Sequence, residues 1–127
     1  MPDPAGPAAH PLLQLTVDRT DGAVVLQLSG RMDAEGVREI QDRFESAADG
    51  TAPILIDLSG VAFMDSLGIA LLVRLAKRLR SHAMPVAVIP GPGPVARLLG
   101  LARVDRILNI VFTRDDAWGI LKATPSG

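Results

Sequence analysis

The sequence predicts one α/β domain with a mostly parallel mixed sheet of about five strands and helices mainly on one face. An alternating segment and an apolar segment flank the turn residues Thr20-Asp21-Gly22, as in an N-terminal β-hairpin. Strand-like and helix-like segments then form four repeated βα units as far as Lys122, which is typical of parallel strands joined by right-handed crossovers. Polar Gln27 and Asp57 interrupt two apolar strands, so we expect one face of the sheet to be partly open.

The composition excludes several classes of function. The 127 residues suffice for one domain, and 48% of them are apolar, so a core can form. A net charge of −1 and 3% aromatic residues indicate no direct nucleic-acid partner. The chain has no cysteine, and its two histidines are His10 in a proline-rich segment and His82 at a helix end. We therefore expect no metal, no cofactor and no catalytic residues.

No segment reaches the roughly 18 consecutive apolar residues of a membrane span, and the N-terminus does not have the pattern of a secretory signal. We expect a cytoplasmic protein that does not contact the membrane. Residues 1–11 contain four prolines and are predicted to be a disordered tail. The folded domain is predicted over 12–122, followed by a C-terminal tail over 123–127.

The first half of the chain predicts two strands, a helix and a third strand. The first strand alternates, and the second covers 24–28. Asp33 can cap a helix over 34–48, and Asp49-Gly50-Thr51 ends it. The third strand covers 54–58. The residues expected on one buried side are Leu13, Leu15 and Val17 in the first strand, Val37, Ile40, Phe44 and Ala47 (or Ala48) in the helix, and Ile54, Ile56 and Leu58 in the third strand.

The second half predicts three helices and two strands. A helix over 66–81 should bury one side and expose basic residues on the other. A strand over 86–89 leads to a short helix over 94–99 that Gly100 closes. A fifth strand over 110–112 precedes a last helix to Lys122. The buried side of the first of these helices is Leu67, Ala70, Leu71, Leu75 and Leu79, its exposed side is Arg74, Lys77, Arg78 and Ser81, with Arg80 at its end, and Asp115 or Asp116 caps the last helix.

The segment Asp65-Ser66-Leu67-Gly68 is the most informative motif, because it lies where a strand gives way to a helix. A helix N-terminus carries unpaired N–H groups and a partial positive charge, which suit a phosphate. The local alternative is that Ser or Asp merely caps the helix. Capping does not explain Gly68 in the first turn, where glycine costs about 1 kcal/mol. A missing side chain there is consistent with the close approach of a partner or a neighbouring loop.

The strand at 54–58, the loop at 59–64 and the motif at 65–68 together resemble the signature of the STAS domain, and more narrowly that of the bacterial anti-sigma factor antagonists. The segment at 28–34 also resembles the second-strand motif of that family. The similarity covers about 12–122. The resemblance implies a STAS fold and a protein that acts by reversible binding.

The resemblance also implies a partner-switching cycle. The serine that matches Ser66 is phosphorylated by an anti-sigma factor that is itself a serine kinase. The unmodified antagonist binds the anti-sigma factor and frees the sigma factor. The phosphorylated form dissociates, and a metal-dependent serine phosphatase resets it. The implied partner-binding residues are Asp33, Asp65, Ser66, Leu67 and Gly68. Many relatives have a second Ser or Thr where this chain has Leu67.

The charge pattern predicts that phosphorylation acts at an interface. A phosphate adds about −1.5 to −2 charges, Asp65 is adjacent, and no Arg or Lys lies between Thr51 and Val73 to bind it locally. The helix dipole favours the phosphate by about 0.3–1 kcal/mol and Asp65 offsets part of this, so we expect no large refolding. Asp33 has two readings, as a helix cap and as a neighbour of the switch serine.

Other readings of the chain remain. Gly91-Pro92-Gly93-Pro94-Val95-Ala96 fits GxGxxA after a strand, but its two prolines remove N–H groups that a pyrophosphate would need. Calorimetry would test the small nucleotide-dependent enzyme that this motif suggests. A non-switching STAS scaffold or sensor module of a larger complex is the main alternative, and the oligomeric state is left open.

Two sets of charged residues, an aspartate pair and the basic residues of one helix, also have purely structural explanations. Asp57 and Asp65 could form a carboxylate pair for Mg²⁺ or acid–base work, although a strand end and a cap explain them. The basic residues of the helix over 66–81 are read as a solvated face, or else as a surface that meets an acidic partner.

Overall fold

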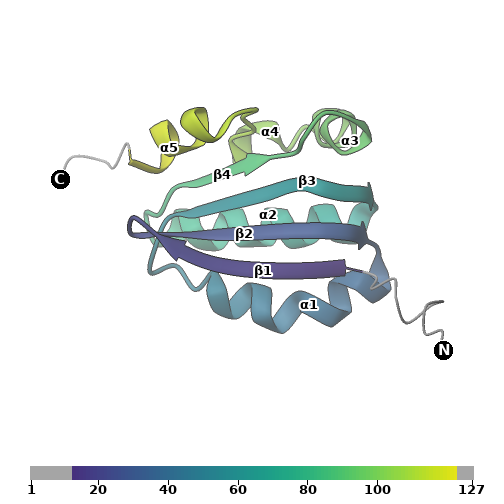
Figure 1. Ribbon diagram of the computed structural model, residues 1–127, viewed down its shortest axis with the longest axis horizontal. Helices are drawn as coiled ribbons and strands as arrows, with labels where there is room; N and C mark the ends of the chain where they lie inside the picture. Colours follow the sequence, from purple (N-terminus) through teal and green to yellow (C-terminus); the bar gives the residue numbers. More distant parts are fainter. Residues whose placement is uncertain (1–12, 123–127) are drawn as a thin grey trace.

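A four-stranded mixed sheet in the order β1-β2-β3-β4 forms the centre of the molecule (Figure 1). The computed structural model describes residues 13–122, so both predicted tails lie outside the described part. The strands are β1 (Leu13–Thr20), β2 (Ala23–Met32), β3 (Ile54–Met64) and β4 (Val86–Ile89). β1 pairs antiparallel with β2, and the remaining neighbours pair in parallel. The predicted α/β class and the hairpin-first order are confirmed.

The hairpin turn follows from two residues that adopt positive φ. Thr20 pairs with Ala23, so Asp21 and Gly22 form a two-residue loop, with φ values of 53° and 80°. Such a turn matches the twist of the strands it joins, and Asp-Gly is one of its preferred sequences. The structure confirms the hairpin that the sequence predicts.

The fifth strand predicted over 110–112 is wrong, because the chain makes only one parallel bridge there, between Val88 and Ile110. Asn109 precedes the bridge in the left-handed conformation, and its side-chain amide donates to the Val86 carbonyl at 2.9 Å. Phe112 then turns outward and is 68% exposed. The sharp bend before the bridge and the helix that starts soon after it leave no length for a ladder.

Two long helices cover one face of the sheet, and the last helix packs on the other. α1 (Ala34–Ala47) and α2 (Ser66–Ser81) share a core with Ile54, Ile56 and Leu58 of β3. α5 (Arg114–Lys122) packs through Ala117 and Leu121 against Val25, Leu55 and Ala87. Gln27 pairs with Asp57, and Gln27 is exposed there. The expected partly open face is therefore confirmed.

The predicted buried residues of the first helix are confirmed, whereas those of the second are partly wrong. Val37, Ile40, Phe44 and Ala47 are all buried in α1. In α2, Leu67 and Ala70 are exposed, and Gly68 and Leu72 take their places inside. The buried residues keep one helical spacing from Gly68 to Leu79, and Leu67 and Ala70 lie outside this face.

The C-terminal helices require three corrections. α3 (Pro94–Leu101) continues through Gly100 instead of closing there. A short helix that the sequence analysis missed, α4 (Asp105–Leu108), follows. α5 is capped by Thr113, whose hydroxyl accepts from the Asp116 N–H at 3.0 Å, and not by Asp115 or Asp116.

β3 is much longer than β4, and this difference creates a special edge. β4 pairs with β3 only as far as Asp57, opposite Ile89, while β3 continues to Met64. On the β4 side, the remaining part of β3 has no strand neighbour among the described residues. α3 packs beside it instead. β2 and β3 end side by side, since Met32 pairs with Met64.

The core at α1 predicts a large difference between two phenylalanines. Phe44 is completely buried, so Phe44→Ala should lower the free energy of unfolding by about 3–5 kcal/mol. Phe112→Ala is the matched control, and its effect should stay within about 0.5 kcal/mol because the ring is exposed. Urea unfolding followed by circular dichroism measures both; equal losses would contradict the assigned core.

Candidate functional site

Ser66 is exposed at the junction of β3 and α2. β3 ends at Met64, Asp65 is the N-cap, and Ser66 is the first residue of the helix. Its hydroxyl therefore lies at the positive end of a 16-residue helix. This position allows a modifying enzyme to reach the oxygen from solvent.

Asp65, and not Ser66, caps the helix. The Asp65 carboxylate accepts from the N–H groups of Leu67 at 2.9 Å and Gly68 at 3.3 Å. Its backbone is extended, with φ −113° and ψ −169°, as an N-cap requires. Because Asp65 supplies the cap, the Ser66 hydroxyl is not needed to hold the start of α2. The capping reading thus explains the aspartate and leaves the serine unexplained.

Asp33 occupies the same position at the start of α1. It accepts from the Gly36 N–H at 3.0 Å and from Arg31 Nε at 3.3 Å. The Gly36 N–H is the main cause that holds the pKa of Asp33 below its usual value; desolvation opposes this, and Arg31 lowers the pKa further. The expected cap is confirmed, and Asp33 is an ionised group at the edge where α1 begins.

Strand register brings the two caps to one edge of the sheet. Met32 pairs with Met64, and the Asp65 N–H donates to the Met32 carbonyl at 3.2 Å. Asp33 and Asp65 each follow one of these methionines. The starts of α1 and α2 are therefore neighbours, and Ser66 directly follows one of the two capping aspartates.

Gly68 faces inward and lets α2 approach the sheet. A Cβ atom at this position would lie 2.8 Å from Met64 Cγ and 3.1 Å from both the Cβ and the carbonyl oxygen of Met32. The space left by the missing side chain is filled by the ends of β2 and β3. A neighbouring segment of the same chain, and not a partner, thus accounts for glycine in the first turn.

Arg31 is a cation at this edge that sequence reasoning missed. It pairs across the strands with Phe63, and its guanidinium lies 4.5 Å from the centre of the Phe63 ring. The same group forms an ion pair with Asp33. No signal near Ser66 in the sequence could have found Arg31, because a parallel crossover and two register irregularities separate the two segments.

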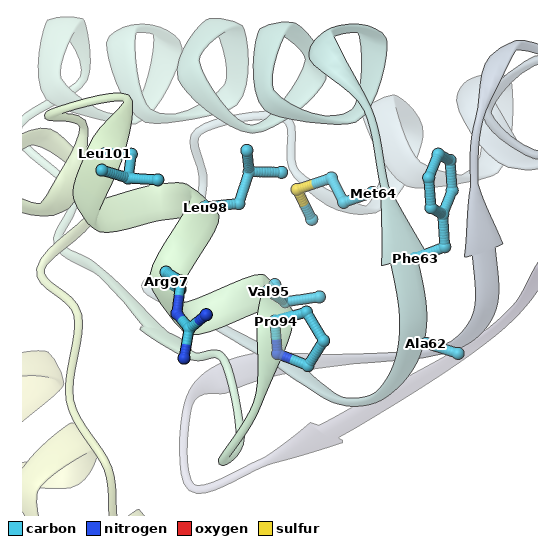
Figure 2. Close-up of a pocket in the computed structure, with 8 residues that line it drawn as sticks. All are labelled: Ala62, Phe63, Met64, Pro94, Val95, Arg97, Leu98 and Leu101. Atoms are coloured by element: carbon cyan, nitrogen blue, oxygen red, sulfur yellow. The ribbon is translucent and has the colours of Figure 1, made fainter.

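An apolar groove of about 320 Å³ lies between the end of β3 and α3. Figure 2 shows Met64 projecting from β3 toward Leu98 of α3, with Val95 below it. Arg97 is the single charged residue in its lining. The lining residues are Ala62, Phe63, Met64, Pro94, Val95, Arg97, Leu98 and Leu101. Met64, which lines the groove, therefore precedes Ser66 by only two residues in the chain.

Large apolar side chains are exposed around this groove. Phe63 is 39% exposed and Leu101 is 74% exposed in its lining, and Leu67, directly after Ser66, is 48% exposed. Exposed apolar residues that gather near one site are typical of protein-binding surfaces. The exposure of Leu67 fits its predicted place in the partner-binding set better than its predicted place in the core.

The glycine-rich loop before α3 has a structural explanation. Gly91 has a φ of +76°, and a Cβ there would lie 2.9 Å from Ser59 Cα. Gly93 is the N-cap with a φ of +147° and no side-chain cap, and Pro94 starts the helix. The tight turn and the close approach to β3 account for this motif without a nucleotide.

Asp57 and Asp65 are too far apart to act as a pair. About 25 Å of extended chain separates them along β3. Asp57 accepts from the Ser59 N–H at 2.9 Å and its hydroxyl at 2.6 Å, and from Arg114 Nη2 at 3.1 Å. It thereby ties the start of α5 to the sheet. Within residues 13–122, no three His, Asp or Glu side chains gather as metal ligands would.

The basic side of α2 is partly structural. Arg78 is half-buried, and its Nη1 lies 3.3 Å from the Glu45 carbonyl and 3.4 Å from that of Ala48, at the end of α1. Arg74 forms an ion pair with Glu45 at 3.3 Å. The reading of a fully solvated face is therefore wrong for Arg78, because it satisfies carbonyls that a helix end leaves unpaired.

Comparison with known proteins shows the family. The family model described as "Mlab, STAS domain" matches residues 15–111. The chain belongs to the STAS domain family. It is similar to the anti-sigma-F factor antagonist RsfA of Mycobacterium tuberculosis, with 28% identity over 122 residues that cover 91% of this chain and 95% of the relative.

Solved structures show the same fold. The crystal structure of an anti-sigma factor antagonist from Mycobacterium paratuberculosis has a TM-score of 0.78 and 26% identity, and it covers 87% of this STAS domain and 94% of that chain. A STAS domain protein from Planctomyces limnophilus has a TM-score of 0.70 and 28% identity, with 81% and 92% covered. Within residues 13–122, no helix of this STAS domain combines the length and apolar character needed to cross a bilayer.

Close packing at Gly68 predicts opposite effects for two Gly→Ala changes in this STAS domain. Gly68→Ala should lower the free energy of unfolding by about 1–3 kcal/mol, because the new methyl group crowds Met32 and Met64. Gly119→Ala in α5 meets open space and should raise it by about 0.5–1 kcal/mol. Thermal and urea unfolding compare them. Stabilisation by both changes would show that α2 does not need the close approach.

The Asp57 contacts predict a pH-dependent contribution to stability. Burial opposes ionisation of Asp57, yet the Ser59 hydroxyl and N–H, together with Arg114, hold its pKa below the usual value. A lowered pKa stabilises the fold above the unfolded-state value of about 3.9 and ceases to do so as pH falls through the folded-state value. Asp57→Asn should therefore be less stable than the native chain at pH 7.

The deficit of Asp57→Asn should shrink as the pH falls below about 4. Urea unfolding at pH 7 and pH 3 measures this change. Asp18→Asn, at an exposed position of β1, is the matched control and should change stability little at either pH. A deficit that is equal at both pH values would exclude the carboxylate as its source.

Proposed function

We propose that this STAS domain is an anti-sigma factor antagonist that Ser66 phosphorylation switches off. In its unmodified form it binds an anti-sigma factor that is a serine kinase, and the sigma factor is released. The observation that carries the proposal is the exposed Ser66 at the first position of α2, beside an aspartate that already caps the helix. The names of the similar proteins support the same function.

Phosphorylation acts on the interface with little effect on the fold. The N-terminal end of α2 tolerates the new charge, while Asp65 and Asp33 oppose it. Since Asp65 keeps its contacts with Leu67 and Gly68, the start of the helix has no reason to unfold. An unpaired phosphate forced out of water against a partner commonly costs several kcal/mol. A loss of about 2–5 kcal/mol is roughly 30- to 5,000-fold in affinity.

The other residues of the predicted site have distinct parts in this scheme. Ser66 and exposed Leu67 contact the anti-sigma factor directly, and Asp33 and Asp65 present their carboxylates beside the serine. Gly68 is buried, so it acts through the position of α2. A metal-dependent serine phosphatase removes the phosphate. The protein itself is a cytoplasmic regulator without catalysis, cofactor, or contact with nucleic acid or membrane.

Substitutions at Ser66 test the switch. Ser66→Ala should abolish phosphorylation by the anti-sigma factor and ATP and should keep native affinity, because the hydroxyl caps nothing. Ser66→Asp should weaken binding, within the range of about 30- to 5,000-fold that a full phosphate would cause. Calorimetry and intact mass spectrometry with each serine-kinase anti-sigma factor of the same organism provide the measurement. Ser81→Asp, an exposed serine at the far end of α2, is the control and should bind normally.

Two results would reject the proposal. One is native affinity of Ser66→Asp for the factor that binds the unmodified chain. The other is the absence of phosphate on Ser66 in protein recovered from its own cells under every growth condition. A stable high-order complex together with both results would favour a non-switching STAS scaffold.

A further inference from the structure

The groove between β3 and α3 exists because β3 runs far beyond β4. β4 stops opposite Asp57, and α3 fills the space beside the rest of β3 with side chains and not with a strand. Pro94 at the start of α3 has no N–H to offer. A segment that enters the groove meets apolar side chains such as Met64 and Leu98 (Figure 2). Apolar side chains on both walls suit the apolar face of an amphipathic helix.

The walls of the groove are apolar, and the α3 wall carries a cation. Arg97 projects from α3 and is exposed. Arg31, whose guanidinium covers the ring of Phe63, is not part of the lining. Arg31 and Asp33 are paired with each other, and Asp65 caps α2. The charge of the lining itself is positive, because Arg97 is its one charged residue.

We infer that the groove between β3 and α3 binds an acidic amphipathic helix of the anti-sigma factor, with aliphatic residues in the groove and carboxylates against Arg97. The inference rests on the proposed function for the identity of the partner. Apolar burial supplies affinity, and the charge pairs set orientation and association rate. Leu101 of the lining is 74% exposed and adds to the apolar contact.

This occupant explains the direction of the switch. Met64 lines the groove, and Ser66 follows it by two residues. A phosphate on Ser66 brings two negative charges to the mouth of a site that receives carboxylates. This repulsion weakens binding, whereas a basic partner would be bound more tightly after phosphorylation.

The test uses the full chain and two synthetic amphipathic helices with the same leucine face. One helix carries glutamate on its flanks and the other carries lysine at the same positions. Methyl-detected NMR titration with each peptide should show shifts at Val95, Leu98 and Leu101 for the glutamate peptide, with affinity about tenfold or more above that of the lysine peptide. Phosphoserine at position 66 should lower the affinity for the glutamate peptide about tenfold.

Charge reversal provides the decisive variant. Arg97→Glu should lower the affinity for the glutamate peptide about tenfold and should raise the affinity for the lysine peptide. Arg106→Glu, an exposed arginine of α4 outside the groove lining, carries the same charge change and should alter neither affinity. Both arginines are exposed, so both variants should fold, and thermal unfolding verifies this.

The outcomes separate this inference from the proposed function. Equal affinity for the two peptides, shifts outside the groove, or no binding at millimolar peptide would overturn the acidic-helix inference. Native affinity of Arg97→Glu for an anti-sigma factor whose binding depends on Ser66 phosphorylation would also overturn it. The proposed Ser66 switch would then remain without the acidic-helix inference. If the two peptides bind as expected but no anti-sigma factor changes its affinity when Ser66 is substituted or phosphorylated, the proposed function fails. The inference that the groove prefers an acidic helix then still holds.

Discussion

The parallel register between β2 and β3 is the constraint on which the rest of the site depends. Because Met32 lies opposite Met64, the two strands end together and both helices start at one edge. The hydrogen bond from the Asp65 N–H to the Met32 carbonyl at 3.2 Å ties the two strand ends together. Gly68 completes the junction by admitting the first turn of α2 against both methionines. A shift of one residue would turn these side chains to the opposite face.

This arrangement separates the group that holds the helix from the group that can be modified. Asp65 satisfies two N–H groups of α2, so a change at Ser66 leaves the cap intact. The consequence is a rigid platform on which a charge can be added or removed. An exposed hydroxyl at a positive helix end suits such a role, since the fold tolerates the phosphate while a partner surface does not.

The unequal lengths of β3 and β4 have a second consequence. The end of β3 needs a neighbour, and α3 supplies one with apolar side chains whose packing is incomplete. Exposed Phe63, Leu67 and Leu101 gather around the same place. The polar contact of Asp57 with Arg114 holds α5 against the other face, away from this groove. One end of the sheet thus combines the modifiable serine, the cations and the apolar surface.

Local patterns in the sequence determined the hairpin, the extents of α1 and α2, the cap at Asp33 and the serine at the start of α2, because turn chemistry, periodicity and capping act over a few residues. They could not determine the fate of Ile110, where a bend at Asn109 allows one bridge instead of a strand. They also placed Leu67 inside, because it is four residues before Leu71, whereas the buried face runs through Gly68 and leaves Leu67 exposed beside it. Only the tertiary structure brought Arg31 over Phe63 and Leu98 opposite Met64. Those contacts join segments that are distant in the chain, and their geometry comes from sheet register and helix packing, which no local pattern encodes.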